Sequence, residues 1–301
     1  MKIKAPGFLQ KGDIIGITCP AGYLEPAKAK QCIQTLQQWG FEVWVGNTLK
    51  GKSKNYFSAT DEERTNELQA MLDAPEIKAI LCGRGGYGIS RIIDQLDFRK
   101  FKKNPKWIIG FSDITLLHCH LHSKYKISSM HAPMAAAFKE GENKYILSIK
   151  DMLSGKPIRY SIKRNKWNRP GTATGKLVGG NLALITHAIG TSSELNTKNK
   201  ILFIEDISEH LYQVDRMLMQ LKRSGALKNL AGLVVGHFSD IKDTVRPFGK
   251  TIEEIISDHT SAYNYPVCFG FPAGHEKENL ALKIGSTYTL KVEKNKVMIS
   301  E

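Results

Sequence analysis

The sequence is poor in cysteine, and its cysteines form no motif. Its 301 residues include five cysteines, an odd number, and none belongs to a Cys-x-x-Cys pair. Most of them lie within apolar runs, which is typical of buried thiols in a reducing compartment.

Long hydrophobic segments are absent as well. No apolar run is long enough to span a bilayer, and the first residues, MKIKAPGFLQKGD, lack the apolar core of a signal peptide. We therefore expect a cytoplasmic protein without a membrane partner. Internal repeats and low-complexity tracts are also missing, and the length favours two domains.

Acidic residues are in the minority. The chain has 29 Asp and Glu against 43 Lys and Arg, which gives a formal net charge of +14. The lysines are scattered, and the sequence contains no RNA-binding aromatic motif, zinc-finger spacing or basic helix with heptads. We expect no nucleic-acid partner. The charge favours solubility or attracts anionic substrates.

Short apolar segments alternate with helical patterns in the first half of the chain. Segments predicted as buried strands are 13–20, 41–45, 79–82 and 107–109. Between them, Thr60 to Glu63 resembles a capping box that opens a helix to about Leu72. This alternation predicts an α/β fold with a doubly wound parallel sheet, which binds ligands at the carboxyl ends of its strands.

The alternation breaks near residue 152, where glycine and proline lie among charged residues and threonines. Such a composition predicts a linker. We place the N-terminal domain at residues 1–155, the linker at 156–175 and a C-terminal β/α domain at 176–301.

The stretch KWIIGFSDIT, residues 106–115, joins a predicted strand to a predicted helix. Ser112 lies at the turn between them. A serine there can cap the helix by accepting a hydrogen bond from its first turn. It can also be a nucleophile at the carboxyl edge of the sheet, beside free N–H groups that hold an oxyanion. Taken alone, the cap is the commoner role.

The segment GRGGYG, Gly83 to Gly88, fits the dinucleotide-binding pattern between a strand and a helix. It follows the third strand rather than the first, and no acidic residue lies about 20 residues further on to hold a ribose. A nucleotide site remains one interpretation. The other is a loop that brings backbone N–H groups to a reacting centre and supplies a second oxyanion donor beside the Asp113 N–H.

Histidines cluster after Ser112. His118 and His122 lie one helical turn apart, which is a metal-ligand spacing. The segment has no HExxH glutamate and no third ligand at a usual offset, so we favour surface or interface histidines and expect no metal. His131 is interpreted as a core or loop histidine.

His275 differs because it lies in a glycine-rich loop just after an apolar strand. Glu205 ends the apolar run ILFI. It is either a charge at a helix start or the carboxylate that orients a histidine. Ser112, Glu205 and His275 follow the chain order of the α/β-hydrolase triad.

Four segments together resemble the LD-carboxypeptidase family of serine peptidases. They are GRGGYG, GFSDIT, LFIEDISEHLYQVDRML and GFPAGHEKENLALKIG. The resemblance runs almost end to end, from DIIGITCPAG to the C-terminal strands. It implies an N-terminal flavodoxin-like domain, a C-terminal swivelling β/α domain and a homodimer without a cofactor.

The resemblance also assigns the site. It implies Ser112 as nucleophile, His275 as base and Glu205 as its partner, with the N–H groups of Asp113 and Gly86 as the oxyanion hole. The implied reaction releases the terminal D-Ala from murein tetrapeptides in peptidoglycan recycling.

Three questions stay open in the sequence. Arg84 is either an anchor for the substrate's terminal carboxylate or part of a structural ion pair. A microcin C immunity-type peptidase, which cleaves a peptidyl-nucleotide, is the alternative within the same family. A non-catalytic nucleotide-binding module built on GRGGYG is the alternative of another class.

Overall fold

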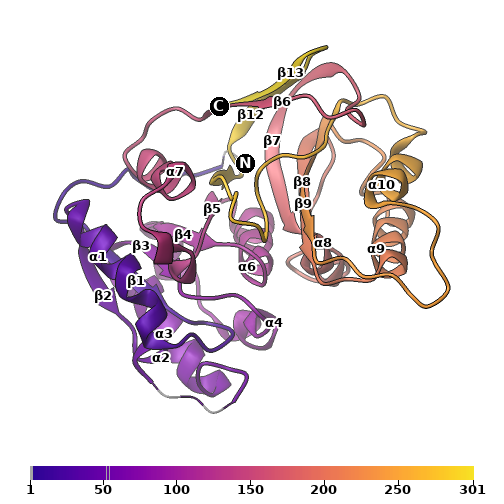
Figure 1. The fold of residues 1–301 in the computed structure, drawn as a ribbon. Coiled ribbons are helices and arrows are strands. Elements are labelled where there is room, and N and C mark those ends of the chain that lie inside the picture. The colour runs from indigo at the N-terminus through magenta and orange to yellow at the C-terminus, as the bar shows by residue number, and fades with distance from the viewer. Residues whose placement is uncertain (1–2, 52, 54) are drawn as a thin grey trace. The chain divides into compact units, whose positions relative to one another are not determined.

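The computed structural model describes residues 3–51, 53 and 55–301, and the chain divides into two compact units (Figure 1). The first unit comprises the chain up to Lys156 together with Leu280–Lys283. The second comprises Pro157–Asn279 and Ile284–Glu301. The chain therefore builds most of the second unit before a short segment returns to the first.

The first unit is organised around a six-stranded sheet with the order β11-β5-β4-β3-β1-β2. Its strands are β1 (Ile14–Thr18), β2 (Glu42–Val45), β3 (Ile77–Cys82), β4 (Trp107–Gly110), β5 (Ser129–His131) and β11 (Leu282–Ile284). Strands β1 to β5 pair in parallel. Because the order β2-β1-β3-β4-β5 is that of flavodoxin-like sheets, the predicted fold class of this unit is confirmed.

Helices cover both faces of this sheet. They are η1 (Pro26–Ala29), α1 (Lys30–Gln38), α2 (Asn47–Lys50), α3 (Asp61–Asp73), α4 (Ile89–Ile92), η2 (Ile93–Gln95), α5 (Arg99–Lys103), α6 (Ile114–His120), η3 (Leu121–Tyr125), η4 (Ala135–Glu140) and α7 (Lys144–Leu153). Helix α1 packs with η4, whereas α3 contacts α4 and α5, and α4 contacts α6. The chain runs from β1 to β2 in one direction across the sheet and then crosses back to β3 on the other side of β1. Because such crossovers are right-handed, α1 and η4 lie on one face of the sheet, and α3, α4, α5 and α6 lie on the other.

Helix α3 begins as the sequence predicts. Thr60 Oγ1 accepts from the Glu63 N–H at 3.2 Å, and Glu63 Oε2 accepts from the Thr60 N–H at 2.9 Å. This capping box satisfies two backbone donors that a helix start leaves free. The first turn of α3 is therefore firmly anchored.

The second unit contains a seven-stranded sheet with the order β10-β9-β8-β7-β12-β13-β6. Its strands are β6 (Arg159–Lys163), β7 (Gly171–Asn181), β8 (Lys200–Ile207), β9 (Gly232–Ser239), β10 (Val267–Cys268), β12 (Thr287–Val292) and β13 (Lys296–Ser300). The strands from β7 to β10 are parallel, and those from β7 to β6 are antiparallel. Helices α8 (Leu182–His187), α9 (Leu211–Arg223) and α10 (Ile252–Thr260) lie beside the parallel strands (Figure 1).

The structure places strands within the range 156–175, where the sequence predicts a linker. Strand β6 pairs with β13, and β7 begins at Gly171. These residues therefore contain strand structure that the sequence analysis did not identify, whereas the linker and the domain boundaries stay a prediction. Strand β6 lies at the sheet edge and alternates between exposed and half-buried residues, so it lacks the apolar run that marks a buried strand.

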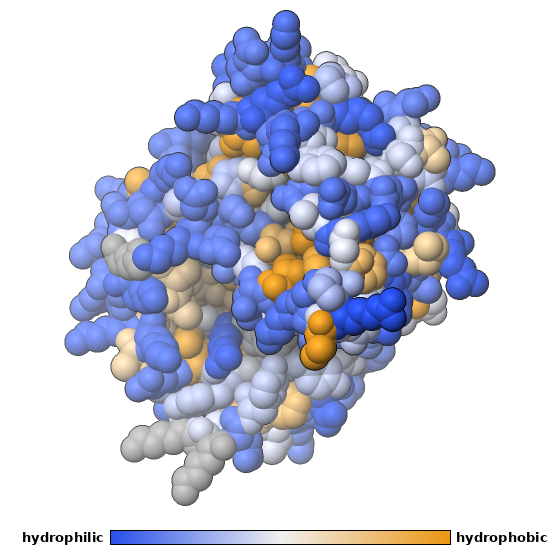
Figure 2. All heavy atoms as spheres, turned by 45° about the vertical axis from the view of Figure 1, so that its right-hand side comes forward, coloured by the Kyte–Doolittle hydropathy of each residue, from blue (hydrophilic) through white to orange (hydrophobic). Residues whose placement is uncertain are grey.

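One face of the molecule is largely polar. Figure 2 shows a face on which hydrophilic residues predominate and hydrophobic residues form small groups. All five cysteines are free and buried, as the sequence predicts. Within the described ranges, no helix combines the length and the apolar character that crossing a membrane requires.

Candidate active site

The turn after β4 holds Ser112 in an unusual backbone conformation. Ser112 has a φ of +61°, in the left-handed region that non-glycine residues rarely occupy. Helix α6 starts at Ile114, its N-cap is Asp113, and no side chain caps it. The helix-cap interpretation of Ser112 is therefore wrong. A strained serine between a strand and a helix is instead the arrangement of a nucleophile elbow.

The glycine loop, Gly83–Gly88, lies directly against this serine. A Cβ atom at Gly85 would lie 2.8 Å from Ser112 Cβ, 3.0 Å from Ser112 Oγ and 3.4 Å from the Asp113 amide nitrogen. Only glycine leaves room for this approach. The amide of Gly86 follows at once, so both predicted oxyanion donors, Gly86 and Asp113, lie on the segments that meet here.

Within the described ranges, neither of these two amides has a hydrogen-bond acceptor. Gly86 has a φ of +97°, a conformation that glycine adopts without strain. Free N–H groups beside a serine hydroxyl are what an oxyanion hole requires. The two donors stay a prediction, and the loop geometry is compatible with it.

The Asp113 carboxylate joins the two segments. Its Oδ2 accepts from the Ile89 N–H at 2.8 Å, just after the glycine loop. Asp113 is buried, and burial raises the pKa of its carboxyl to about 6, against the lowering effect of that hydrogen bond. The side chain thus links the serine turn to the start of α4.

A cavity of about 800 Å³ lies elsewhere in the first unit, at the carboxyl end of β2. Its described lining comes from positions between 44 and 71 and includes Trp44, Asn47 and Glu67. No residue of the glycine loop is part of that lining. The loop therefore faces the serine rather than this cavity, which weakens its interpretation as a nucleotide cradle.

In the second unit, Glu205 and His275 form a close pair. Glu205 Oε2 lies 2.7 Å from His275 Nδ1, and the Glu205 side chain is fully buried. Glu205 lies on β8 at a register shift between Ile204 and Asp206 in the pairing with β9. Such bulges re-aim a side chain, and here the bulged residue is the one that reaches the histidine.

The loop that carries His275 is fixed on both sides. Along β9, the Phe271 N–H donates to Val235 O and the His237 N–H donates to Ala273 O. The Gly274 N–H donates to Asn279 Oδ1 at 3.1 Å, which closes the loop.

Gly274 has a φ of +131°, and a Cβ there would lie 3.0 Å from Glu205 Oε2. Glycine is therefore required beside the carboxylate.

The electrostatics of the pair favour a charged imidazole. Burial alone lowers the pKa of His275, but its hydrogen bond to Glu205 and the negative charges of Glu205, Asp206 and Glu276 together outweigh burial and hold the pKa above its ordinary value. In a triad the nitrogen bound to the carboxylate is Nδ1, as it is here, and Nε2 is the one that exchanges the proton.

Asp206, the next residue, has another task. Its carboxylate accepts from Asn181 Nδ2 at 2.8 Å and from the Ala183 N–H at 2.9 Å, which fixes the start of α8. Burial and the neighbouring Glu205 raise the pKa of Asp206 to about 7. The two consecutive carboxylates of β8 thus have different partners: Glu205 binds the histidine, and Asp206 binds the start of α8.

The three histidines after Ser112 are buried, so their interpretation as surface histidines is wrong. His118 Nε2 lies 2.9 Å from Gly110 O, and burial lowers the pKa values of His118 and His120 to about 4. His131 is buried at the end of β5 beside the Phe111 ring. Among the residues with described positions, no three His, Cys, Asp or Glu side chains group as metal ligands.

Arg84 is exposed, and its Nη1 donates to Tyr23 O at 2.8 Å. No carboxylate of a described residue lies within ion-pair distance of it. Tyr56, which the sequence interpretation missed, lies nearby: a Cβ at Gly86 would be 3.0 Å from the Tyr56 hydroxyl. An isolated tyrosine in a polar loop carries no periodic signal that could have identified it.

The structure therefore brings Ser112, Asp113 and the glycine loop together in the first unit. It brings Glu205 and His275 together in the second.

Comparisons with known proteins cover both units. A family model described as the LD-carboxypeptidase N-terminal domain matches residues 15–132. A model described as the LD-carboxypeptidase C-terminal domain matches residues 174–290.

Two relatives differ in their described activity. The chain is 36% identical over 286 residues to a probable murein peptide carboxypeptidase of Bacillus subtilis, covering 93% of this chain and 89% of that protein. It is 26% identical over 332 residues to the microcin C7 self-immunity protein MccF of Escherichia coli, covering 97% and 94%.

Solved structures of both kinds of relative are similar to this chain. A muramoyltetrapeptide carboxypeptidase from Oxalobacter formigenes is similar with a TM-score of 0.87 and 30% identity, over 95% of this chain and 98% of that one. MccF in complex with glutamyl sulfamoyl guanosine has a TM-score of 0.85 at 23% identity, over 99% and 98% of the two chains. At that identity the likeness concerns the fold.

Proposed function

Because the chain belongs to the LD-carboxypeptidase family, and is therefore a carboxypeptidase, we propose that it releases the terminal D-Ala from murein tetrapeptides through a Ser112–His275–Glu205 triad. The Glu205–His275 pair carries this proposal, because a buried carboxylate that holds the Nδ1 of a loop histidine has the geometry of a triad.

In the proposed reaction, His275 Nε2 takes the proton of Ser112 as its Oγ attacks the scissile carbonyl. The imidazolium that forms is stabilised by Glu205. The N–H groups of Gly86 and Asp113 bind the oxyanion, and His275 then protonates the leaving D-Ala amine. Water, activated by the same histidine, releases the acyl group from Ser112.

A carboxypeptidase must also recognise the free terminal carboxylate. We assign this role to Arg84, since its exposed guanidinium has a carbonyl partner and no carboxylate partner among the described residues. Tyr56 can add a neutral donor beside Gly86. Cytoplasmic peptidoglycan recycling and a homodimeric state belong to the same proposal.

Replacing Ser112 by alanine tests the nucleophile. Ser112→Ala should abolish D-Ala release from a murein tetrapeptide, since it removes the attacking oxygen, and should leave the circular dichroism spectrum unchanged. The measurement is mass spectrometry of the products. An undiminished rate would remove Ser112 from the mechanism.

The MccF relative supports a second candidate, a peptidase that cleaves a peptidyl-nucleotide. Incubating the protein with a tetrapeptide and with a peptidyl-adenylate, and comparing the products by mass spectrometry, separates the two. Thermal-shift measurements with NAD and ATP test a binding module: strong stabilisation without labelling of Ser112 by a serine-directed reagent would favour binding over catalysis.

A further inference from the structure

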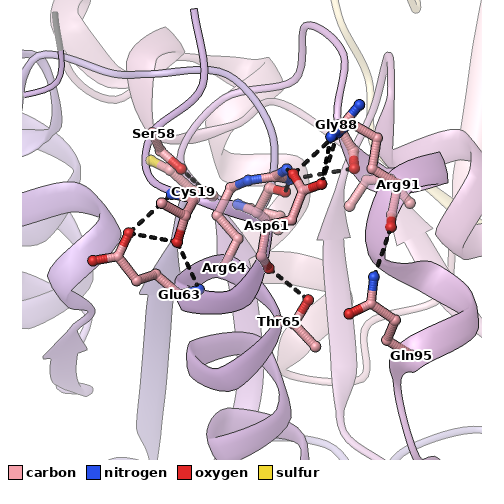
Figure 3. Close-up of polar contacts among 12 residues, drawn as sticks. Cys19, Ser58, Asp61, Glu63, Arg64, Thr65, Gly88, Arg91 and Gln95 are labelled. Carbon is pink, nitrogen blue, oxygen red and sulfur yellow. Dashed lines mark hydrogen bonds and ion pairs between the residues drawn. The ribbon is translucent and has the colours of Figure 1, made fainter. Parts of the chain in front are cut away.

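An arginine lies fully buried beneath the glycine loop. Arg64, on the first turns of α3, has a side chain with an exposed fraction of 0%. Its Nη1 donates to Pro20 O at 2.5 Å and to Gly88 O at 3.2 Å, and its Nη2 pairs with Asp61. Figure 3 shows the Arg64 side chain extending from α3 toward Asp61 and Gly88.

Arg64 therefore holds two loops at once. Pro20 follows β1, and Gly88 ends the glycine loop after β3. A Cβ at Gly88 would lie 2.7 Å from Arg64 Nη1 and 2.9 Å from Ala21 Cα, so the backbone is packed tightly at this point. The guanidinium also stacks over the Phe57 ring, 4.9 Å from its centroid.

One peptide group connects this arginine to the serine turn. The carbonyl of Gly88 accepts from Arg64, and the N–H of the same peptide, that of Ile89, donates to Asp113 Oδ2 at 2.8 Å. The peptide between Gly88 and Ile89 is thus held on both sides by buried charged groups. Asp113 in turn carries one of the proposed oxyanion donors, and the other lies two residues before Gly88.

We propose that Arg64 is a positioning residue that sets the spacing between the two oxyanion donors, Gly86 and Asp113. The inference rests on the proposed function, and it adds a residue that touches no substrate. Two N–H groups stabilise an oxyanion only if both stay within hydrogen-bond distance of it, so a small displacement of one loop weakens the transition state.

The guanidinium is required for this task. Its planar fork donates to several acceptors at fixed angles, whereas a lysine ammonium is a point charge that binds with less geometric control. Arg64→Lys keeps the charge beside Asp61 but cannot hold Pro20 O, Gly88 O and Asp61 in the same arrangement.

Arg91 offers a matched control. It also binds Asp61, with Nε 3.0 Å and 2.9 Å from the two carboxylate oxygens, and its guanidinium lies over the same Phe57 ring. Its side chain is 46% exposed, and it contacts the glycine loop through the Tyr87 side chain, whereas Arg64 binds the backbone carbonyl of Gly88. Arg91→Lys therefore changes the same ion pair and keeps the Arg64 hydrogen bonds to Pro20 O and Gly88 O; Figure 3 shows both arginines near Asp61.

The experiment compares substrate turnover with binding of a transition-state analogue. A peptide aldehyde with the substrate's acyl sequence forms a tetrahedral adduct with the serine, and its oxygen occupies the oxyanion hole. For Arg64→Lys we expect kcat and the affinity for this aldehyde to fall together, by roughly 10- to 100-fold, with KM changed less than about 3-fold. For Arg91→Lys both should stay within about 2-fold, as for exposed pairs generally.

A merely structural role would lower the melting temperature without this joint loss. The inference is overturned if folded Arg64→Lys loses kcat while aldehyde affinity is unchanged, if both are unchanged, or if Arg91→Lys loses as much. Should Arg64→Lys fail to fold, Asp61→Asn replaces it. This variant keeps the buried guanidinium of Arg64 but weakens its ion pair, so kcat and aldehyde affinity should again fall together, by a smaller factor. Unchanged values in Asp61→Asn would equally overturn the inference.

Ser112→Ala is measured beside these variants. If it stays active, the proposed function fails. If it is inactive while Arg64→Lys is unaffected, only the positioning role fails.

Discussion

In the proposed mechanism, Glu205 sets the pH range in which His275 can act as a base. A base must be neutral to accept the serine proton, and the hydrogen bond and charge of Glu205 keep the pKa of His275 above its ordinary value despite burial. Activity should therefore rise with pH through a midpoint above the ordinary histidine value of about 6.5. The same pairing contributes stability that is complete below that ordinary value and is lost as pH rises through the folded pKa.

Glu205→Gln is expected to move this midpoint to lower pH, because burial alone lowers the pKa of His275 once the charge is gone. The plateau of kcat/KM should fall by about 10⁴-fold, since the imidazolium loses its stabilising carboxylate. The measurement is the pH profile of kcat/KM with a tetrapeptide. The variant should also lose more stability at pH 5 than at pH 8.

Glu276→Gln is the control for this substitution. Glu276 is exposed and acts on His275 only through its charge, so its removal should shift the midpoint far less. An unchanged midpoint in Glu205→Gln, or an equal shift in both variants, would contradict the role of Glu205.

The role of a single residue can be impossible to decide from the sequence, and Ser112 is an example. Ser112 is chemically suited to cap a helix, and only its φ of +61° decides that it does not. Backbone dihedrals of this kind depend on tertiary packing, in this case on Gly85 against the serine. Residue type alone could not supply that information.

At the scale of elements, the contact between the glycine loop and the serine turn leaves no room for an added side-chain atom. Gly85→Ala places a methyl group 2.8 Å from Ser112 Cβ, so one of the two segments must move. We expect kcat to fall by about 10²-fold, as a displacement of about 1 Å does in an active site, with a stability loss of about 1–3 kcal/mol. Steady-state kinetics and thermal unfolding measure the two effects.

Gly7→Ala provides the comparison within the same unit. A Cβ at Gly7 has nothing within 4 Å, so kcat and stability should both stay close to wild type. Full activity of Gly85→Ala would show that the loop can shift without moving Ser112.

Elements differ in how well the sequence predicts them. The parallel strands around the serine turn were predictable because, apart from the exposed Lys78, they are buried and apolar. Strand β6 was missed because half-buried edge residues give no such run. A buried role for Arg64 could have been predicted from the sequence. It shares the buried face of α3 with Leu68 and Met71, where a charged residue needs partners.

At the scale of the whole molecule, the proposed triad depends on both units. Ser112 belongs to the first, whereas Glu205 and His275 belong to the second. Sequence order and motifs predict such a combination through the family resemblance, which spans both halves. Local patterns could not predict that residues 280–283 return to the first unit, because the pairing partner of a short strand is a long-range property.

The net charge of +14 should assist substrate capture. A positive protein attracts an anionic peptide over about 30 Å at 0.01 M salt but only about 3 Å at 1 M. We expect kcat/KM for a tetrapeptide to fall on the order of 10-fold over this range, while kcat stays nearly constant. The measurement is steady-state kinetics at several salt concentrations.

The same titration separates general attraction from recognition of the carboxylate. A substrate analogue with a C-terminal amide carries one negative charge less, so its kcat/KM should fall less steeply with salt. Arg84→Gln should lower kcat/KM for the free acid by about 10-fold or more, because a charge-assisted hydrogen bond contributes about 1.5–3 kcal/mol, and should leave the amide nearly unaffected. Equal losses for acid and amide would assign Arg84 to holding the loop through Tyr23 O instead. A salt response without any effect of Arg84→Gln would mean that the attraction is spread over the scattered lysines, and the carboxylate would then need another anchor.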